Sequence, residues 1–164
     1  MPMTETRDTP GVIAPPPLIA LAAVLVGVAL DWLAPAYVLT VLLDLSERLV
    51  IGALLMAAGA ALAVPAMRGF RSAGTHVEPW KPSLVLVTDG IFGWLRNPMY
   101  VGLAFLVAGI GVALASDWTL VMLVAAVLTI HFGVVKREER YLTAKFGDAY
   151  RQYMQTVPRY GWPF

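Results

Sequence analysis

Two charged motifs at the ends of an apolar stretch carry the side chains best suited to chemistry. The first, at residues 96–100, reads Arg-Asn-Pro-Met-Tyr, and the second is the pair Glu138-Glu139. A guanidinium beside the free N–H groups of a helix start holds a carboxylate or a phosphate well. Two adjacent acids facing it could bind an ammonium, ribose hydroxyls or a sulfonium. The motifs predict a polar binding site if the fold brings them together.

The apolar stretch between the motifs predicts that they meet. It runs over residues 98–115, turns at Ser116-Asp117 and returns over residues 118–135. At a helical rise of about 1.5 Å per residue, each leg is roughly 27 to 30 Å long, which matches one bilayer core. A hairpin with so short a turn is antiparallel. We therefore expect the motif that begins at Arg96 to meet the paired acids at one membrane surface.

Structural explanations exist for the same residues. Arg96 could snorkel to lipid phosphates, and the acids could be solvated charges among basic neighbours. Pro98 suits the first turn of a helix, and Tyr100 suits a membrane interface. The antiparallel hairpin favours the binding site, because it would place these residues beside one another.

The two histidines support no metal site. His76 and His131 are far apart in the sequence, no carboxylate pair stands at ligand spacing to either, and the chain has no cysteine. His131 lies seven residues before Glu138, so we expect both on one helix face. A buried structural histidine is the preferred interpretation of His131, with proton handling as the alternative.

The composition is that of an integral membrane protein. Hydrophobic residues make up 59% of the 164 residues, and the mean hydropathy is +0.70. Four apolar segments approach the length of a spanning helix, at residues 17–33, 49–67, 100–115 and 118–135. We predict an all-α, polytopic membrane helix bundle of about four transmembrane helices with a cytoplasmic C-terminal helix.

Local patterns add detail to this bundle. Residues 44–47 form a predicted capping box before the second spanning helix, and residues 37–43 are too short to span. Small residues predict closely packed helix faces: alanines at 53, 57 and 61, and alanines at 104 and 108 with glycines at 102, 109 and 111 beside them. The run 84–87 could be a short strand or a re-entrant segment, in a loop that we expect to cover the site as a lid.

Basic residues set the expected orientation. Outside the apolar segments they lie almost entirely on one side of a four-span arrangement, which the positive-inside rule makes cytoplasmic. We expect a multi-pass protein with both termini and the site in the cytoplasm. Residues 1–14 read as a disordered tail, and residues 15–164 as one domain with a loop at 68–97, a hairpin at 98–135 and a cytoplasmic helix and interfacial tail at 136–164. The net charge of +1 calls for no nucleic-acid partner.

The second half of the chain resembles the isoprenylcysteine carboxyl methyltransferase family. The resemblance rests on residues 86–102 (LVTDGIFGWLRNPMYVG), 138–142 (EERYL), 146–153 (FGDAYRQY) and 157–159 (VPR), in family order and spacing. It implies an integral membrane methyltransferase that uses S-adenosylmethionine and acts on a lipophilic acceptor, most simply the carboxylate of a prenylcysteine-like substrate. Membrane lipids are the other implied partners, and the oligomeric state is left open.

Residue roles also follow from the resemblance. Arg96, Pro98, Tyr100, Glu138 and Glu139 would bind the cofactor. The implied catalytic residues are Arg96, Asn97 and Tyr100.

Two other enzyme classes resemble the same motifs. Asn97 stands where prenylcysteine enzymes usually have His, and Asn-Pro-Met-Tyr is similar to the phospholipid N-methyltransferase branch, which acts on phosphatidylethanolamine. Membrane sterol-type reductases that use NADPH share a related motif, but Met99 replaces their Asn. A carboxylate acceptor needs no base, whereas an amine must first lose a proton.

Overall fold

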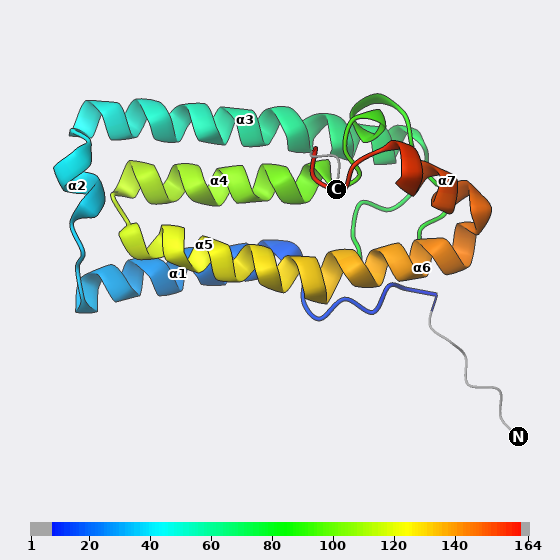
Figure 1. The fold of residues 1–164 in the computed structure, drawn as a ribbon, viewed down its shortest axis with the longest axis horizontal. Helices are drawn as coiled ribbons and strands as arrows, with labels where there is room; N and C mark the ends of the chain where they lie inside the picture. Colours follow the sequence, from blue (N-terminus) through cyan, green and yellow to red (C-terminus); the bar gives the residue numbers. More distant parts are fainter. Residues whose placement is uncertain (1–7, 162–164) are drawn as a thin grey trace, which may run out of the picture.

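The computed structural model describes residues 8–161, and this part of the chain is helical and contains no strand (Figure 1). The elements in chain order are α1 (Pro16–Leu33), α2 (Val38–Leu42), α3 (Leu45–Ser72), a 3-10 turn (Gly90–Gly93), α4 (Pro98–Leu114), α5 (Asp117–Ile130), a π turn (His131–Val135), α6 (Lys136–Phe146) and α7 (Asp148–Thr156). The predicted all-α membrane bundle is confirmed.

The helices α1, α3, α4 and α5 lie side by side along the length of the molecule (Figure 1). α3 packs on α4, α4 on α5, and α5 on α1. Within residues 8–161, three helices are long and apolar enough to cross a membrane: α1, α3 and the continuous helix Asp117–Phe146. The shorter α4 is also apolar and runs antiparallel to α5. In the helix Asp117–Phe146, charged residues fill positions 136–140, so we infer that its membrane-spanning part ends at Val135.

The start of α3 is fixed by the predicted capping box. The Asp44 carboxylate accepts a hydrogen bond from the Glu47 N–H at 2.9 Å, and the Asp44 N–H donates to the Glu47 carboxylate at 2.9 Å. Within the segment 37–43, which was predicted to be too short to span, residues 38–42 form the short helix α2. The carboxylate of Asp117 accepts from the N–H groups of Val38 and Leu39, so this short helix is joined to the α4–α5 turn.

Small residues bring α3 and α4 together as predicted, but on α3 they are glycines and not the predicted alanines. Gly52 and Gly59 are buried and face Gly109 and Gly102, and a Cβ added at Gly102 would lie 2.6 Å from the Gly59 carbonyl oxygen. The alanines at 53, 57 and 61 are exposed, so the expectation that they form the packed face is wrong. Gly52 and Gly59, seven residues apart, form the packed face of α3 because glycine permits a closer approach of two backbones.

A π turn joins α5 to α6 and receives the N-terminal segment. The Gly133 carbonyl oxygen, which lies within this turn, accepts a hydrogen bond from the Ile13 N–H at 3.2 Å. Arg137 donates to the Gly11 carbonyl oxygen at 2.7 Å, and Lys145 pairs with Asp8 at 2.6 Å. Residues 8–14 therefore lie along α6, in contrast to the disordered tail expected there, and residues 1–7 lie outside the described part.

The loop between α3 and α4 contains only one regular element, the 3-10 turn. Residues 84–87 do not form a strand, so that alternative is wrong. Side chains hold this segment instead: the Leu84 N–H donates to the Thr75 hydroxyl at 2.8 Å, and the Ser83 N–H donates to the Tyr141 hydroxyl at 3.1 Å. The loop is thus tied to α6 and forms one wall of the charged end of the bundle.

Candidate active site

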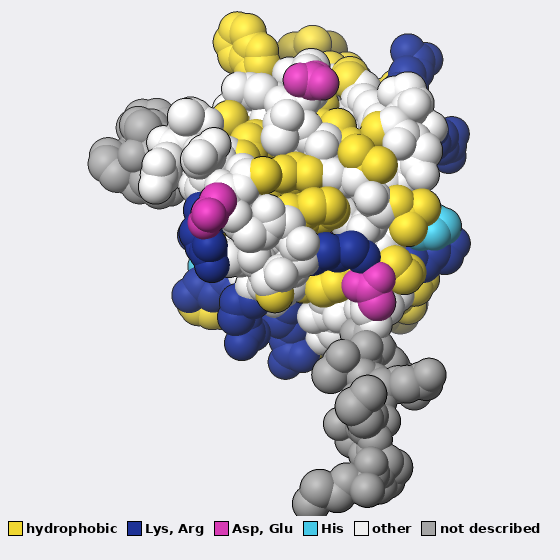
Figure 2. All heavy atoms as spheres, turned by 90° about the vertical axis from the view of Figure 1, so that its right-hand side faces the viewer, with side chains coloured by type: hydrophobic (Ala, Val, Ile, Leu, Met, Phe, Trp, Pro, Cys, Tyr) yellow, Lys and Arg dark blue, Asp and Glu magenta, His cyan; other side chains and the backbone are white. Residues whose placement is uncertain are grey.

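A polar pocket lies at the charged end of the bundle. It has a volume of about 100 Å³ and is lined by the α3–α4 loop, the start of α4, α6 and α7. Figure 2 views this end and shows several Lys and Arg side chains around it. The pocket contains all six predicted site residues: Arg96, Asn97, Pro98, Tyr100, Glu138 and Glu139. The hairpin therefore brings the two motifs together, as the equal length of its legs predicted.

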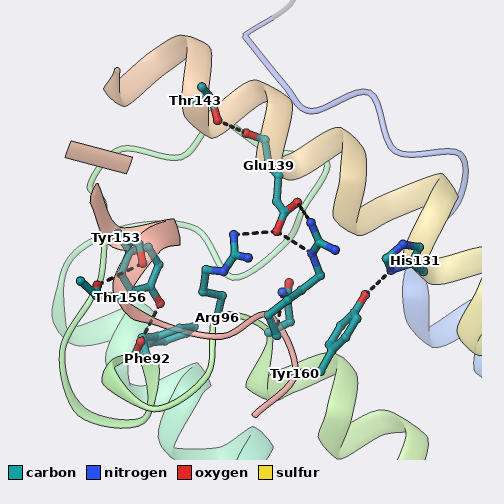
Figure 3. Close-up of polar contacts among 10 residues, drawn as sticks. Phe92, Arg96, His131, Glu139, Thr143, Tyr153, Thr156 and Tyr160 are labelled. Atoms are coloured by element: carbon teal, nitrogen blue, oxygen red, sulfur yellow. Dashed lines mark hydrogen bonds and ion pairs between the residues drawn. The ribbon is translucent and has the colours of Figure 1, made fainter. Parts of the chain in front are cut away.

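Glu139 is held by two arginines. Its Oε1 lies 2.8 Å from Arg96 Nη1, and Arg159 donates to both carboxylate oxygens, from Nε at 2.8 Å and from Nη2 at 2.6 Å. In Figure 3 the Glu139 carboxylate points between the Arg96 side chain and a second guanidinium. The Arg96 and Glu139 side chains are only 9% and 12% exposed, so little water screens this pair. We call these three residues the arginine–glutamate clamp.

Arg96 keeps hydrogen-bonding capacity inside the pocket. Among the described residues its Nε and Nη1 atoms have no hydrogen-bond partner, although Nη1 stands within ion-pair distance of Glu139. The hydrogens of Nη1 thus do not point at that oxygen. A buried guanidinium seldom leaves donors unused, because an unmade hydrogen bond costs about 1 to 3 kcal/mol. These donors fit an anionic group of a ligand in the pocket.

Glu138 has a different environment from its neighbour. Its Oε2 accepts a hydrogen bond from the Tyr100 hydroxyl at 2.8 Å, and within residues 8–161 no Lys, Arg or His lies at ion-pair distance from it. Burial raises the pKa of the Glu138 carboxyl to about 7, although the Tyr100 hydrogen bond acts in the opposite direction. The carboxyl is therefore close to half-ionised at neutral pH.

The C-terminal tail fixes the start of α4. The Arg96 N–H donates to the Pro158 carbonyl oxygen at 2.9 Å, and the Asn97 side chain donates to the Arg159 carbonyl oxygen at 3.1 Å. Asn97 therefore does not cap α4 with its side chain. The first N–H groups of α4, at Met99 and Tyr100, are left without helical partners beside the pocket, which is an arrangement that favours anions.

Two apolar cavities adjoin the polar pocket inside the bundle. One, of about 450 Å³, lies between α4 and α5, and the other, of about 410 Å³, lies between α3 and α4. Both are lined almost wholly by apolar side chains. Tyr100 lines the polar pocket and both cavities. A water-soluble ligand and a lipophilic ligand could therefore meet at this one side chain.

Comparison with known proteins identifies the family. The family model described as phospholipid methyltransferase matches residues 47–149, which is more than half of the chain and includes both charged motifs. The chain belongs to the phospholipid methyltransferase family.

Two relatives of this chain are named protein-S-isoprenylcysteine O-methyltransferase. The protein of Schizosaccharomyces pombe is 40% identical over 76 residues, which are 45% of this chain and 31% of the relative. The protein of Xenopus laevis is 32% identical over 117 residues, which are 70% of this chain and 40% of the relative. The chain thus spans less than half the length of either curated relative, and the predicted resemblance is confirmed.

The positions of Arg159 and His131 were not predicted from the sequence. Arg159 completes the clamp, yet it was noted only as part of a matching tail, since no periodicity links it to the hairpin. His131 does not line the polar pocket; its Nδ1 lies 2.8 Å from the Tyr160 hydroxyl, as Figure 3 shows. The π turn shifts the helix register after His131, so the shared face expected with Glu138 is lost.

Proposed function

We propose that this chain is an integral membrane methyltransferase that transfers a methyl group from S-adenosylmethionine to the carboxylate of a prenylcysteine-like acceptor. The observation that carries the proposal is the position of Tyr100, which lines the polar pocket and both apolar cavities. A polar donor and an apolar acceptor need separate compartments that meet at one point. The names of the two relatives support the choice of acceptor.

The residues of the polar pocket fit this donor. Arg96 offers buried donors without partners, and the start of α4 offers free N–H groups, so both suit the donor's carboxylate. The acids suit its cationic groups. When bound, S-adenosylmethionine supplies an activated methyl group on a sulfonium sulfur. Arg96, Pro98, Tyr100, Glu138 and Glu139 are the proposed binding residues, and the clamp keeps Arg96 in place.

The apolar cavities fit a lipophilic acceptor tail. Both cavities lie between apolar helices, so a prenyl chain could enter sideways from the bilayer while the donor enters from the water. The acceptor carboxylate would then lie near Arg96, Asn97 and Tyr100, which are the proposed catalytic residues. A carboxylate needs no base, so positioning and exclusion of water supply most of the rate.

The site is proposed to face the cytoplasm. The helical bundle has one end rich in basic residues, and the described parts of both chain ends lie there (Figure 1). Basic residues favour the cytoplasmic side of a membrane. Protease treatment of sealed, oriented membrane vesicles tests this, since cleavage within residues 73–89 should occur only from the cytoplasmic side.

A transfer assay tests the proposed function. Detergent-purified protein is incubated with methyl-labelled S-adenosylmethionine and either a farnesylcysteine analogue or phosphatidylethanolamine. The proposal predicts transfer to the farnesylcysteine carboxylate, loss of transfer in Arg96→Ala, and retained transfer in the control Arg151→Ala, whose partner Asp148 is exposed. Transfer to a small water-soluble acceptor in place of both lipids would contradict the proposal.

An amine phospholipid is the second candidate acceptor, and the His131–Tyr160 pair favours it. Tyr160 lines the cavity between α4 and α5, and its hydroxyl lies 2.8 Å from His131 Nδ1. Burial raises the pKa of Tyr160 to about 12, so the phenol stays neutral and could pass a proton to the imidazole. Transfer to phosphatidylethanolamine that is lost in His131→Ala would establish this acceptor. Transfer to farnesylcysteine that survives His131→Ala would establish the carboxylate.

A further inference from the structure

The two adjacent acids of α6 differ in the number of cations that face them. Glu139 lies between Arg96 and Arg159, at distances of 2.6 to 2.8 Å. Glu138 has a single hydrogen-bonding partner, the Tyr100 hydroxyl, and no cation at ion-pair distance among the described residues. Adjacent positions on a helix point about 100° apart, which explains how one acid reaches the clamp while the other faces the pocket.

An ionised carboxylate without a cation is unfavourable in this position. Glu138 lines the polar pocket beneath the α3–α4 loop, and the neighbouring Glu139 adds a like charge. Both effects raise the pKa of the Glu138 carboxyl, with burial the larger of the two. Any positive group that enters the pocket beside Glu138 would therefore favour its ionised form. The protein itself leaves that position for a ligand.

We propose that Glu138 is the counterion of the donor's sulfonium centre, so that the charged donor binds with release of the Glu138 proton and the neutral product is held less tightly. This inference rests on the proposed function, because it requires a sulfonium donor. It assigns different roles to the two acids: Glu139 positions Arg96, whereas Glu138 distinguishes donor from product by charge.

The charges balance through one turnover. A lone pair of the acceptor carboxylate forms the new O–CH₃ bond, and the electron pair of the broken S–CH₃ bond stays on sulfur. A sulfonium and a carboxylate thus become a neutral thioether and a neutral ester. Glu138 is then left without a cation, and it takes up a proton from water. This favours release of S-adenosylhomocysteine and readies the pocket for another donor.

Other groups near Glu138 also affect the pH dependence. The Tyr100 hydroxyl from α4 donates to it, and Tyr150 from α7 and Tyr160 from the tail are near enough to feel its charge. Burial raises the pKa values of Tyr150 and Tyr160 to about 12, so both stay neutral between pH 6 and 8. The clamp residues Arg96, Glu139 and Arg159 are paired. From the loop, Glu78, Lys81 and His76 line the same pocket.

A comparison of donor and product binding isolates the role of Glu138. The affinities of the purified chain for S-adenosylmethionine and S-adenosylhomocysteine are measured by calorimetry between pH 6 and 8. Both ligands meet the same His76, so their affinity ratio removes its effect. A carboxyl with a pKa of about 7 is roughly 10% ionised at pH 6 and roughly 90% at pH 8. The ratio of donor to product affinity should therefore rise about tenfold over this range.

Two variants and one further measurement complete the test. Glu138→Gln should remove this rise in the affinity ratio. Any pH dependence of the ratio that remains in Glu138→Gln comes from ionisable groups of the two ligands themselves. Glu78→Gln, which removes a pocket carboxylate that pairs with Lys81, should keep the rise. If Glu138→Gln does not fold, the number of protons released on binding is measured with the unmodified protein. Calorimetric titrations at pH 7 in buffers of different ionisation enthalpy should show that binding of the donor releases about half a proton more than binding of the product.

The outcomes separate this inference from the proposed function. A ratio that rises in the unmodified protein and is constant in Glu138→Gln supports the inference. Binding of both ligands with a constant ratio, or with equal proton release, overturns it and leaves the proposed function standing. Failure of both ligands to bind overturns the proposed function and the inference together.

Discussion

Arg96 Nη1 and Glu139 Oε1 lie 2.8 Å apart, although a complete helical hairpin separates the two residues in the sequence. The contact exists because α4 and the helix Asp117–Val135 have similar lengths and run antiparallel. Arg159 from the C-terminal tail binds the same carboxylate. The clamp therefore joins three distant parts of the chain around the polar pocket.

Removing the charge of Glu139 should destabilise the protein more than removing that of Glu138. Glu139→Gln leaves Arg96 and Arg159 without their shared anion, and we expect it to lower the free energy of unfolding by about 1.5 to 3 kcal/mol. Glu138→Gln loses no cation partner and can still accept from Tyr100, so its effect should stay below about 1 kcal/mol. Thermal unfolding in detergent, followed by circular dichroism, measures both. Equal losses would contradict the different environments of the two acids.

Arg159→Lys should loosen the C-terminal tail while keeping its charge. A lysine ammonium cannot donate in parallel to both oxygens of Glu139, as the guanidinium does. We expect faster hydrogen exchange at residues 157–161 and at least threefold weaker donor binding. The matched change Arg151→Lys, at an exposed pair with Asp148, should alter neither quantity. Unchanged exchange in Arg159→Lys would show that the tail is held without the clamp.

Gly102→Ala should separate α3 from α4. The added Cβ would lie 2.6 Å from the Gly59 carbonyl oxygen, so the two backbones must move apart, at a cost of about 1 to 3 kcal/mol. Gly93→Ala is the control, because its Cβ would meet only the Thr88 carbonyl oxygen at 3.6 Å. Thermal unfolding distinguishes the variants. If both proteins unfold at the same temperature, the close approach of the helices contributes little.

Gly133→Ala should displace the N-terminal segment from the π turn. The new Cβ would overlap the Ile13 side chain, which packs directly on Gly133. Hydrogen exchange at residues 11–13 should become faster, and the double variant Gly133→Ala/Ile13→Ala should restore slow exchange, since only the Ile13 Cβ would then remain, at 3.6 Å. Restoration is the decisive result. Fast exchange in the double variant would mean that the substitution acts by unwinding the π turn.

The membrane bundle and the meeting of the motifs could be predicted because both depend on length. Apolar runs of spanning length and a two-residue turn leave one arrangement of the hairpin, and it carries Arg96 to α6. Which acid meets the arginine could not be predicted, since Glu138 and Glu139 are adjacent and the intervening π turn changes the helix register. The same turn invalidated the spacing argument that linked His131 to Glu138.

Other contacts depend on packing that sequence patterns do not specify. The alanine spacing on α3 suggested one packed face, but glycine at 52 and 59 permits a closer approach and forms the observed face. The position of Arg159 depends on how the tail folds back over α4, where Pro158 and Arg159 accept hydrogen bonds from the Arg96 backbone and the Asn97 side chain. The loop at 73–89 is fixed by side-chain hydrogen bonds, which have no periodic signature.

Binding of S-adenosylhomocysteine to the detergent-purified chain tests the central claim most directly, because that claim is a methyl-donor pocket around Arg96. Calorimetric titration should show binding of S-adenosylhomocysteine, at least tenfold weaker binding in Arg96→Ala, and no binding of NADPH. Binding of NADPH without any response to S-adenosylhomocysteine would contradict the account.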